Sequence, residues 1–101
     1  MTITKDLIGN EAVLKVDGRL DTQTSPELLS AIEGLGDTVT SLRLDFAGLE
    51  FISSAGLRVV LFAQKKMMAA GGKMKILNPN EIVSEIFDVT GFSDILDIEK
   101  A

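Results

Sequence analysis

Two adjacent serines, Ser53 and Ser54, are the side chains of this sequence best placed to do chemistry. They stand directly before a run with helical spacing, which we expect to span Ala55–Ala70. The first backbone N–H groups of a helix have no partner within the helix, and the helix dipole makes that end positive. A phosphate on a serine at this position is tolerated by the fold and adds about −1.5 to −2 charges at one point. The residues leave open the alternative that a serine here only caps the helix.

Most catalytic chemistry is excluded by composition, because the chain contains no cysteine and no histidine. Disulfides, thiolate metal sites, an ordinary zinc site, a Ser-His-Asp triad and a Cys-His dyad all need residues that are missing. The motif around Ser54 also lacks the Gly-x-Ser-x-Gly elbow of serine hydrolases and holds no lysine that could act as a base. We therefore expect a protein that is not an enzyme and needs no metal or cofactor.

The net charge of −5 argues against nucleic-acid binding, because phosphate backbones repel an acidic surface. The first residues carry charges where a secretion signal needs an apolar run, and the longest nearly apolar run, Val59–Ala63, is too short to cross a bilayer. We expect a cytoplasmic protein that binds neither nucleic acid nor membrane.

The elements that must position the serines can be predicted from the pattern of the chain. Strands over Thr2–Ile8 and Ala12–Leu20, with Gly9-Asn10 between them, indicate an antiparallel hairpin. Thr24 and Glu27 form a capping-box pattern that begins a helix, which Gly34 and Gly36 end. The residues expected on the buried face of this helix are Leu28, Leu29, Ile32 and Leu35.

The second half of the chain predicts parallel strands joined by the serine-initiated helix. Alternating residues indicate strands at Ser41–Phe46 and Lys73–Leu77, with a loop containing Gly48 after the first. A strand, a crossover helix and a strand imply a parallel pair. A further helix follows Asn78-Pro79-Asn80 and ends at Gly91, and Asp94–Ile98 is a short strand or an extended tail. The buried stripe expected on that helix is Ile82, Val83, Ile86 and Phe87.

These elements predict one α/β domain over residues 1–101, with a mixed sheet of four or five strands and about three helices packed on it.

On the Ala55–Ala70 helix, one face should pack on the sheet, and Phe62 falls on the other side among basic residues. An aromatic ring rimmed by basic residues suits a protein partner, and the alternative is a ring tucked against the neighbouring helix. Gly56 within this helix indicates close packing or the close approach of another molecule. The residues expected to face the sheet are Leu57, Val60, Leu61, Met67 and Met68.

The segment Phe51–Val60, Phe-Ile-Ser-Ser-Ala-Gly-Leu-Arg-Val-Val, resembles the signature of STAS domains, in particular bacterial anti-sigma factor antagonists. Gly18–Asp21 looks like the Gly-x-Leu-Asp motif that ends the second strand of the family, and Leu42–Phe46 looks like its central strand. Gly71-Gly72-Lys73 and Val89–Phe92 match later landmarks, so the resemblance covers nearly the whole chain.

The resemblance implies a domain that binds an anti-sigma factor, often a serine kinase, and thereby frees the sigma factor. Phosphorylation of a serine by that kinase ends the binding, and a PP2C-type phosphatase reverses it. The matching serine here is Ser54, with Ser53 as the second candidate because it stands where the family often has Asp. The family often has a further C-terminal helix, which we expect to be short or absent here. The partner-binding residues that we expect are Asp21, Ser53, Ala55, Gly56, Arg58 and Phe62. The alternative for Asp21 is a solvated carboxylate in a turn or a helix cap.

A second interpretation stays open, in which the domain is an accessory subunit of another complex, such as a lipid-transport or nucleotide-responsive assembly, without phosphorylation. A switch needs a phosphorylatable residue and such a subunit does not, so Ser54 favours the antagonist. The oligomeric state is not predicted by the sequence.

Overall fold

The hairpin predicted at Gly9-Asn10 begins the fold. The computed structural model describes residues 1–100 and pairs Ile8 with Glu11, so residues 9 and 10 form a two-residue turn. Gly9 supplies the positive φ of 61° that this turn requires.

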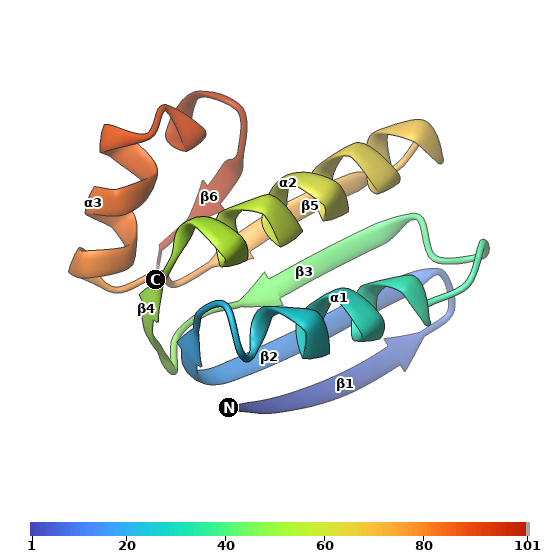
Figure 1. Ribbon diagram of the computed structural model, residues 1–101. Helices are drawn as coiled ribbons and strands as arrows, with labels where there is room; N and C mark the ends of the chain where they lie inside the picture. The colour runs from blue at the N-terminus through green and yellow to red at the C-terminus, as the bar shows by residue number, and fades with distance from the viewer. Residues whose placement is uncertain (101) are drawn as a thin grey trace.

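The elements in chain order are β1 (Thr2–Ile8), β2 (Glu11–Leu20), α1 (Ser25–Glu33), β3 (Ser41–Asp45), β4 (Leu49–Ile52), α2 (Ser54–Ala69), β5 (Lys73–Leu77), α3 (Glu81–Val89), a 3-10 helix (Phe92–Asp94) and β6 (Asp97–Glu99) (Figure 1).

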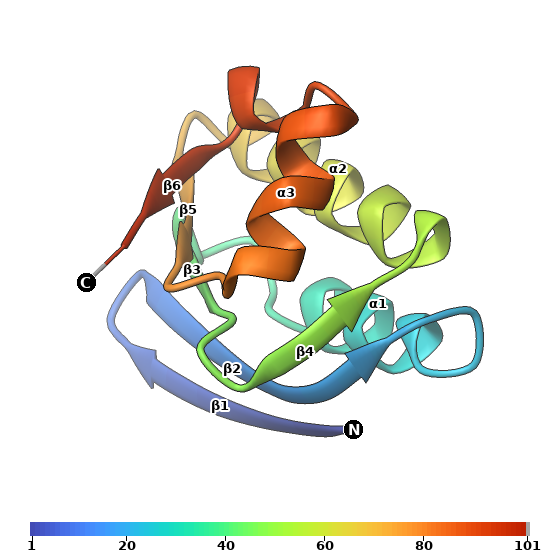
Figure 2. The ribbon, with the colours of Figure 1, turned by 90° about the vertical axis from the view of Figure 1, so that its left-hand side faces the viewer.

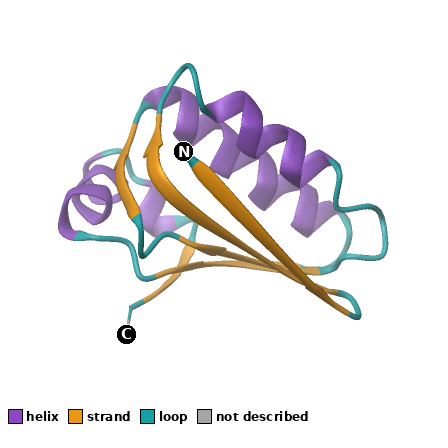
Figure 3. Ribbon diagram, turned by 90° about the horizontal axis from the view of Figure 1, so that it is seen from below, coloured by secondary structure: helices purple, strands orange, loops and turns teal. Residues whose placement is uncertain are grey.

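The sheet has the order β1-β2-β3-β5-β6, and β4 pairs separately with the end of β2. Only the β1–β2 pair is antiparallel, and the other pairs are parallel. The predicted parallel pair of β3 and β5 is confirmed, with Leu42 opposite Met74 and Leu44 opposite Ile76. Helices α1 and α2 lie side by side on one face of the sheet, and no described residue forms a helix on the other face (Figures 1 and 3).

The core lies between the sheet and these helices. Strand residues alternate, so Leu42 and Leu44 are buried while Arg43 between them is exposed. From the helices, Leu28, Ile32, Val60 and Met67 close the core. Helix α3 packs beside β4, and the chain returns through the 3-10 helix to β6 (Figure 2). The predicted α/β class is confirmed, and the described residues contain no further helix after β6.

The described residues form six strands rather than the four or five expected. The additional strand is β4, which we expected to be part of the loop containing Gly48. The strand is only four residues long and pairs with β2 across a register shift at Gly18–Arg19, so it lacks the long alternation that predicts strands. Directly before β4, the Gly18 N–H donates to the Gly48 carbonyl at 2.9 Å and begins the contact between the two segments.

Two helix faces differ from the prediction. Ile82 is 55% exposed, although we expected it to be buried, because α3 turns Val83 and Phe87 toward the core. The Asn80 side chain holds the start of α3 against β4, since it accepts from the Val83 N–H at 2.8 Å and donates to the Leu49 carbonyl at 3.1 Å. On α2, Met68 is 65% exposed, since it lies about 100° round the helix from buried Met67. Leu61 and Leu29 are half-buried at the rim.

Strand β1 forms one edge of the sheet, with β2 as its only pairing partner among the described strands. Apart from half-buried Ile3, its residues are exposed, and Lys5 stands at its centre. None of the helices in the described part of the chain is long and apolar enough to cross a membrane.

Candidate functional site

The serine pair and Asp21 meet at one end of the sheet, where β2 and β4 finish in parallel. Leu20 lies opposite Ile52 in the register, and the Ser53 N–H donates to the Leu20 carbonyl at 2.8 Å. Asp21 follows Leu20 and Ser54 follows Ser53, so the two side chains leave the sheet from neighbouring strand ends. The structure thus brings together two residues that are far apart in the sequence.

The two serines differ in accessibility. Ser53 occupies the N-cap position of α2 with an extended backbone (φ −94°, ψ 178°), but its side chain makes no capping hydrogen bond. Its Oγ is buried and has no hydrogen-bond partner among the described residues. Ser54 is the first residue of the helix and is exposed. Side-chain capping therefore does not account for either serine, and Ser54 presents the accessible hydroxyl.

The electrostatic surroundings of Ser54 suit an anion. It lies at the positive end of the helix dipole, where backbone N–H groups lack helical partners. Arg58 follows one helical turn later and is exposed on the same side. Helix α2 also carries Lys65 and Lys66 and contains no acidic residue. A phosphate on Ser54 would be compensated by its own helix without unfolding the domain.

Asp21 is held in an ordered turn. Its Oδ1 accepts from the backbone N–H groups of Gln23 at 3.0 Å and Thr24 at 3.1 Å. The Thr24 backbone N–H lowers the pKa of the Asp21 carboxyl from its ordinary value. The Gln23 backbone N–H, the Thr24 hydroxyl and the charge of Arg19 add to that lowering, and partial burial opposes it. Asp21 therefore stays ionised beside the serine pair at neutral pH.

Gly56 differs from the other expected partner-binding residues because it is buried. A Cβ atom at this position would lie 2.7 Å from Ile52 Cγ1 and 2.9 Å from Leu20 Cγ. Of the two explanations that the sequence left open, close packing is therefore the one that the structure supports. The glycine lets α2 begin directly on the ends of β2 and β4, and it offers no surface to a partner.

The remaining expected partner residues lie along the outer side of α2. Ala55 is half-buried and Arg58 is exposed. Phe62 is 39% exposed, so the neighbouring helix does not cover its ring completely. Because it follows Ser54 by eight residues, it lies about 12 Å along the helix from the serine. These residues form a continuous strip with Ser54 at one end.

The signature at the start of α2 and its place in the fold agree with a comparison of the whole chain. A model of the STAS domain family matches residues 2–101. The chain belongs to the STAS domain family.

Individual relatives agree with this assignment. The anti-sigma-B factor antagonist of Bacillus subtilis (strain 168) is 31% identical over 100 residues, covering 97% of this chain and 92% of the relative. The crystal structure of an anti-sigma factor antagonist from Mycobacterium paratuberculosis has a TM-score of 0.86 at 22% identity, covering 97% of this chain and 84% of that one. The Bacillus cell fate determinant SpoIIAA in its phosphorylated form has a TM-score of 0.80 at 21% identity, covering 99% and 91%. The two structures share the fold of this STAS domain.

One expectation about the turn before α1 of this STAS domain is wrong. Thr24 stands at the N-cap of α1 but forms no capping box with Glu27. Its hydroxyl instead donates to the Arg19 carbonyl at 2.7 Å and accepts from the Asp21 N–H at 2.9 Å. The turn that holds Asp21 and the N-terminus of α1 compete for the Thr24 side chain, and the turn binds it. Thr24 therefore orders the turn around Asp21 and does not cap the helix.

The sequence did not indicate the pair formed by Arg19 and Phe51, which lies at the same strand ends as the site. The guanidinium carbon of Arg19 lies 4.9 Å from the centre of the Phe51 ring, an arrangement typical of a cation–π interaction. The two residues are opposite each other in the β2–β4 register. The pair could have been found only by predicting β4, since it is that strand which places Phe51 next to Arg19.

The lowered pKa of Asp21 predicts how the stability of this STAS domain depends on pH. The ionised carboxylate makes its full contribution to the free energy of unfolding above the ordinary aspartate pKa of about 3.9. This contribution is lost as the pH falls through the lower pKa that the carboxyl has in the folded state. An Asp21→Asn variant keeps an oxygen that can accept from Gln23 and Thr24 but has no charge to lose. We expect its free energy of unfolding to approach that of the wild type as the pH falls from about 6 to about 3. Urea titrations at several pH values measure this, and a difference independent of pH would contradict it.

Gly56→Ala is expected to destabilise the STAS domain by about 1–2 kcal/mol. Forcing a methyl group against buried Leu20 and Ile52 costs about 1–3 kcal/mol, and the better helix propensity of alanine returns up to about 1 kcal/mol. Urea unfolding measures the change. Ser54→Ala, at an exposed position of the same helical turn, is the matched control and should change stability by less than about 0.5 kcal/mol. A Gly56→Ala protein more stable than the wild type would show that the helix start has room to move.

Proposed function

We propose that this STAS domain is an anti-sigma factor antagonist that is switched by phosphorylation of Ser54. In its unmodified form it binds an anti-sigma factor and so releases the sigma factor. The anti-sigma factor is a serine kinase that modifies Ser54, and a PP2C-type phosphatase restores the active form. The observation that carries the proposal is the exposed Ser54 hydroxyl at the N-terminus of α2, beside ionised Asp21 and next to the strip that leads to Phe62.

The electrostatics explain how one modification could control binding. In the unmodified protein, the partner meets a neutral hydroxyl flanked by Asp21 and Arg58. A phosphate adds about −1.5 to −2 charges at that point. The helix end stabilises these charges within the domain, while any partner group that accepts from the unmodified hydroxyl, or is itself acidic, must meet a concentrated negative charge. The domain therefore stays folded and the partner is released.

The relatives support the same proposal. The Bacillus subtilis relative is named an anti-sigma-B factor antagonist, and SpoIIAA has been solved in a phosphorylated form. On this proposal the chain acts by binding a protein in the cytoplasm and carries out no chemistry of its own. The partner-binding residues would be Asp21, Ser53, Ala55, Arg58 and Phe62, with Gly56 setting the position of the helix.

Phosphorylation can be tested by incubating the protein with candidate anti-sigma kinases and ATP and then measuring its intact mass. The wild type and Ser53→Ala are expected to gain one phosphate, and Ser54→Ala is expected to gain none. The two alanine variants are matched, because they remove the same hydroxyl from adjacent positions. A mass gain that persists in Ser54→Ala would contradict the assignment to Ser54. If no kinase modifies or binds the chain, the proposed function fails.

A further inference from the structure

The net negative charge of the chain is concentrated near its C-terminus. Residues 76–99 contain six acidic side chains and no lysine or arginine, whereas the whole chain has 15 acidic and 10 basic residues. The remainder of the chain is therefore nearly neutral. Three of the six acidic residues, Glu81, Glu85 and Asp88, lie on α3, and all three are exposed.

Helix α3 also exposes an apolar stripe. Ile82 is 55% exposed, Val89 is 76% exposed and Ile86 is half-buried. Positions i, i+4 and i+7 lie along one side of a helix, so the three side chains form a continuous row about two turns long. Scattered apolar residues on a surface need no explanation, but an ordered row beside a row of acids is the pattern of a docking surface.

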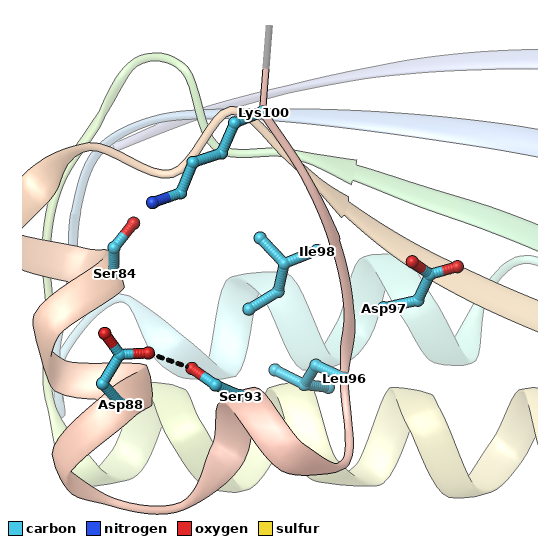
Figure 4. A pocket seen from close by; sticks show the side chains of 7 residues that line it. All are labelled: Ser84, Asp88, Ser93, Leu96, Asp97, Ile98 and Lys100. Carbon is cyan, nitrogen blue, oxygen red and sulfur yellow. Dashed lines mark hydrogen bonds between the residues drawn. The ribbon is translucent and has the colours of Figure 1, made fainter.

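The packing of α3 shows which of its sides are free. Val83 and Phe87 enter the core. Ser84 and Asp88 line a cavity of about 590 Å³ between α3 and β6, where Ser93 donates a hydrogen bond to Asp88 (Figure 4). The apolar stripe lies on the side of α3 away from this cavity, and the acidic row runs between the stripe and the cavity.

We propose that this α3 surface, formed by Ile82, Ile86 and Val89 with Glu81, Glu85 and Asp88, binds a basic amphipathic helical segment of a protein partner. Charge complementarity selects this occupant: its apolar residues would cover the stripe, and its lysines or arginines would face the acidic row. Two copies meeting through α3 would place like charges together, and an anionic membrane would be repelled for the same reason. The surface does not include Ser54, so the inference does not rest on the proposed phosphorylation switch.

The surface can be probed with a designed helical peptide of leucine and lysine, and with a matched peptide in which glutamate replaces lysine. Each is titrated into the ¹⁵N-labelled full chain and followed by chemical shifts. The Leu/Lys peptide is expected to shift the amides of α3, and the Leu/Glu peptide is expected to shift none. Glu85→Lys and Val89→Ser should each weaken the Leu/Lys peptide about 10-fold or more. Asp37→Lys makes the same charge change at an exposed loop position and should weaken it less than about 2-fold.

Several outcomes would overturn the inference. They are the absence of binding, shifts centred outside α3, and equal weakening by Glu85→Lys and Asp37→Lys, which would mean attraction by net charge alone. If sedimentation showed that the chain associates with itself and that Glu85→Lys abolishes this association, the occupant would be the basic helix α2 of a second copy. Because all the substituted side chains are exposed, thermal unfolding should confirm that the variants fold. Ser54→Asp should bind the peptide as the wild type does, which separates a failure here from a failure of the switch.

Discussion

A Ser54→Asp variant is expected to bind the anti-sigma factor about 100-fold more weakly than the wild type does. The substitution puts a permanent negative charge on the first residue of α2, beside the ionised carboxylate of Asp21. An unpaired or like charge enclosed in an interface costs about 2–5 kcal/mol, and about 2.7 kcal/mol corresponds to 100-fold. Phosphorylation adds more charge than Asp does, so it should have at least this effect. Isothermal titration of each variant with the anti-sigma factor measures the change.

Two controls isolate the effect of charge at this position. Ser54→Ala removes the hydroxyl without adding charge, and we expect it to bind within a few-fold of the wild type while resisting phosphorylation. Ser30→Asp places the same charge on the exposed side of α1, away from the start of α2, and should leave the affinity unchanged. If Ser54→Asp binds as tightly as Ser30→Asp, the start of α2 is not at the interface.

Phe87→Ala is expected to lower the free energy of unfolding of the domain by about 3–5 kcal/mol. The Phe87 ring is fully buried and stacks against Phe92, with 6.5 Å between ring centres. It joins α3 and the 3-10 helix to the core, so its loss leaves a cavity with rigid elements on several sides. A folded domain has a total stability of about 5–15 kcal/mol, so this loss is at least about a fifth of the total. Urea unfolding followed by circular dichroism measures the loss.

Phe62→Ala is the matched control, since it makes the same change on a ring that is 39% exposed. We expect it to lower the free energy of unfolding by less than about 1 kcal/mol. It should weaken the anti-sigma factor complex, because the ring belongs to the strip proposed to contact the partner. A Phe62→Ala protein that folds and binds with unchanged affinity would remove Phe62 from the proposed surface.

The parts of the fold that could be predicted from the sequence are those determined by local pattern. The Gly9-Asn10 turn lies between two β-rich segments, and α2 ends just before a pair of glycines where the chain turns into β5. Register and crossover direction then follow from general rules of sheet packing. These elements place the start of α2 at the end of the sheet, and that position is what makes the site.

The parts that could not be predicted depend on contacts between distant segments. Strand β4 is recognisable only through its pairing with the bulged end of β2. The rotation of α3 depends on its contacts with the core and with β4, where the Asn80 side chain donates to the carbonyl of Leu49. A pattern of apolar residues at 82, 83, 86 and 87 does not by itself show which of them face the core.

The site likewise divides into features that local sequence patterns predict and features that depend on contacts between distant segments. Ser54 could be chosen from its place before a helix, and the resemblance added Asp21, but only the fold shows that the two leave neighbouring strand ends. The pair formed by Arg19 and Phe51 was missed together with β4. Gly56 was selected correctly as unusual, and the structure showed that it faces the core rather than a partner.

The open edge formed by β1 affects how the molecule behaves at high concentration. An unpaired strand is a template for joining two sheets into one. Two copies that paired their β1 strands antiparallel about the centre of the strand would bring their Lys5 side chains directly opposite each other on the same face. Like charges in that position oppose the pairing. Lys5 at the middle of the strand therefore disfavours this centred pairing of two β1 edges.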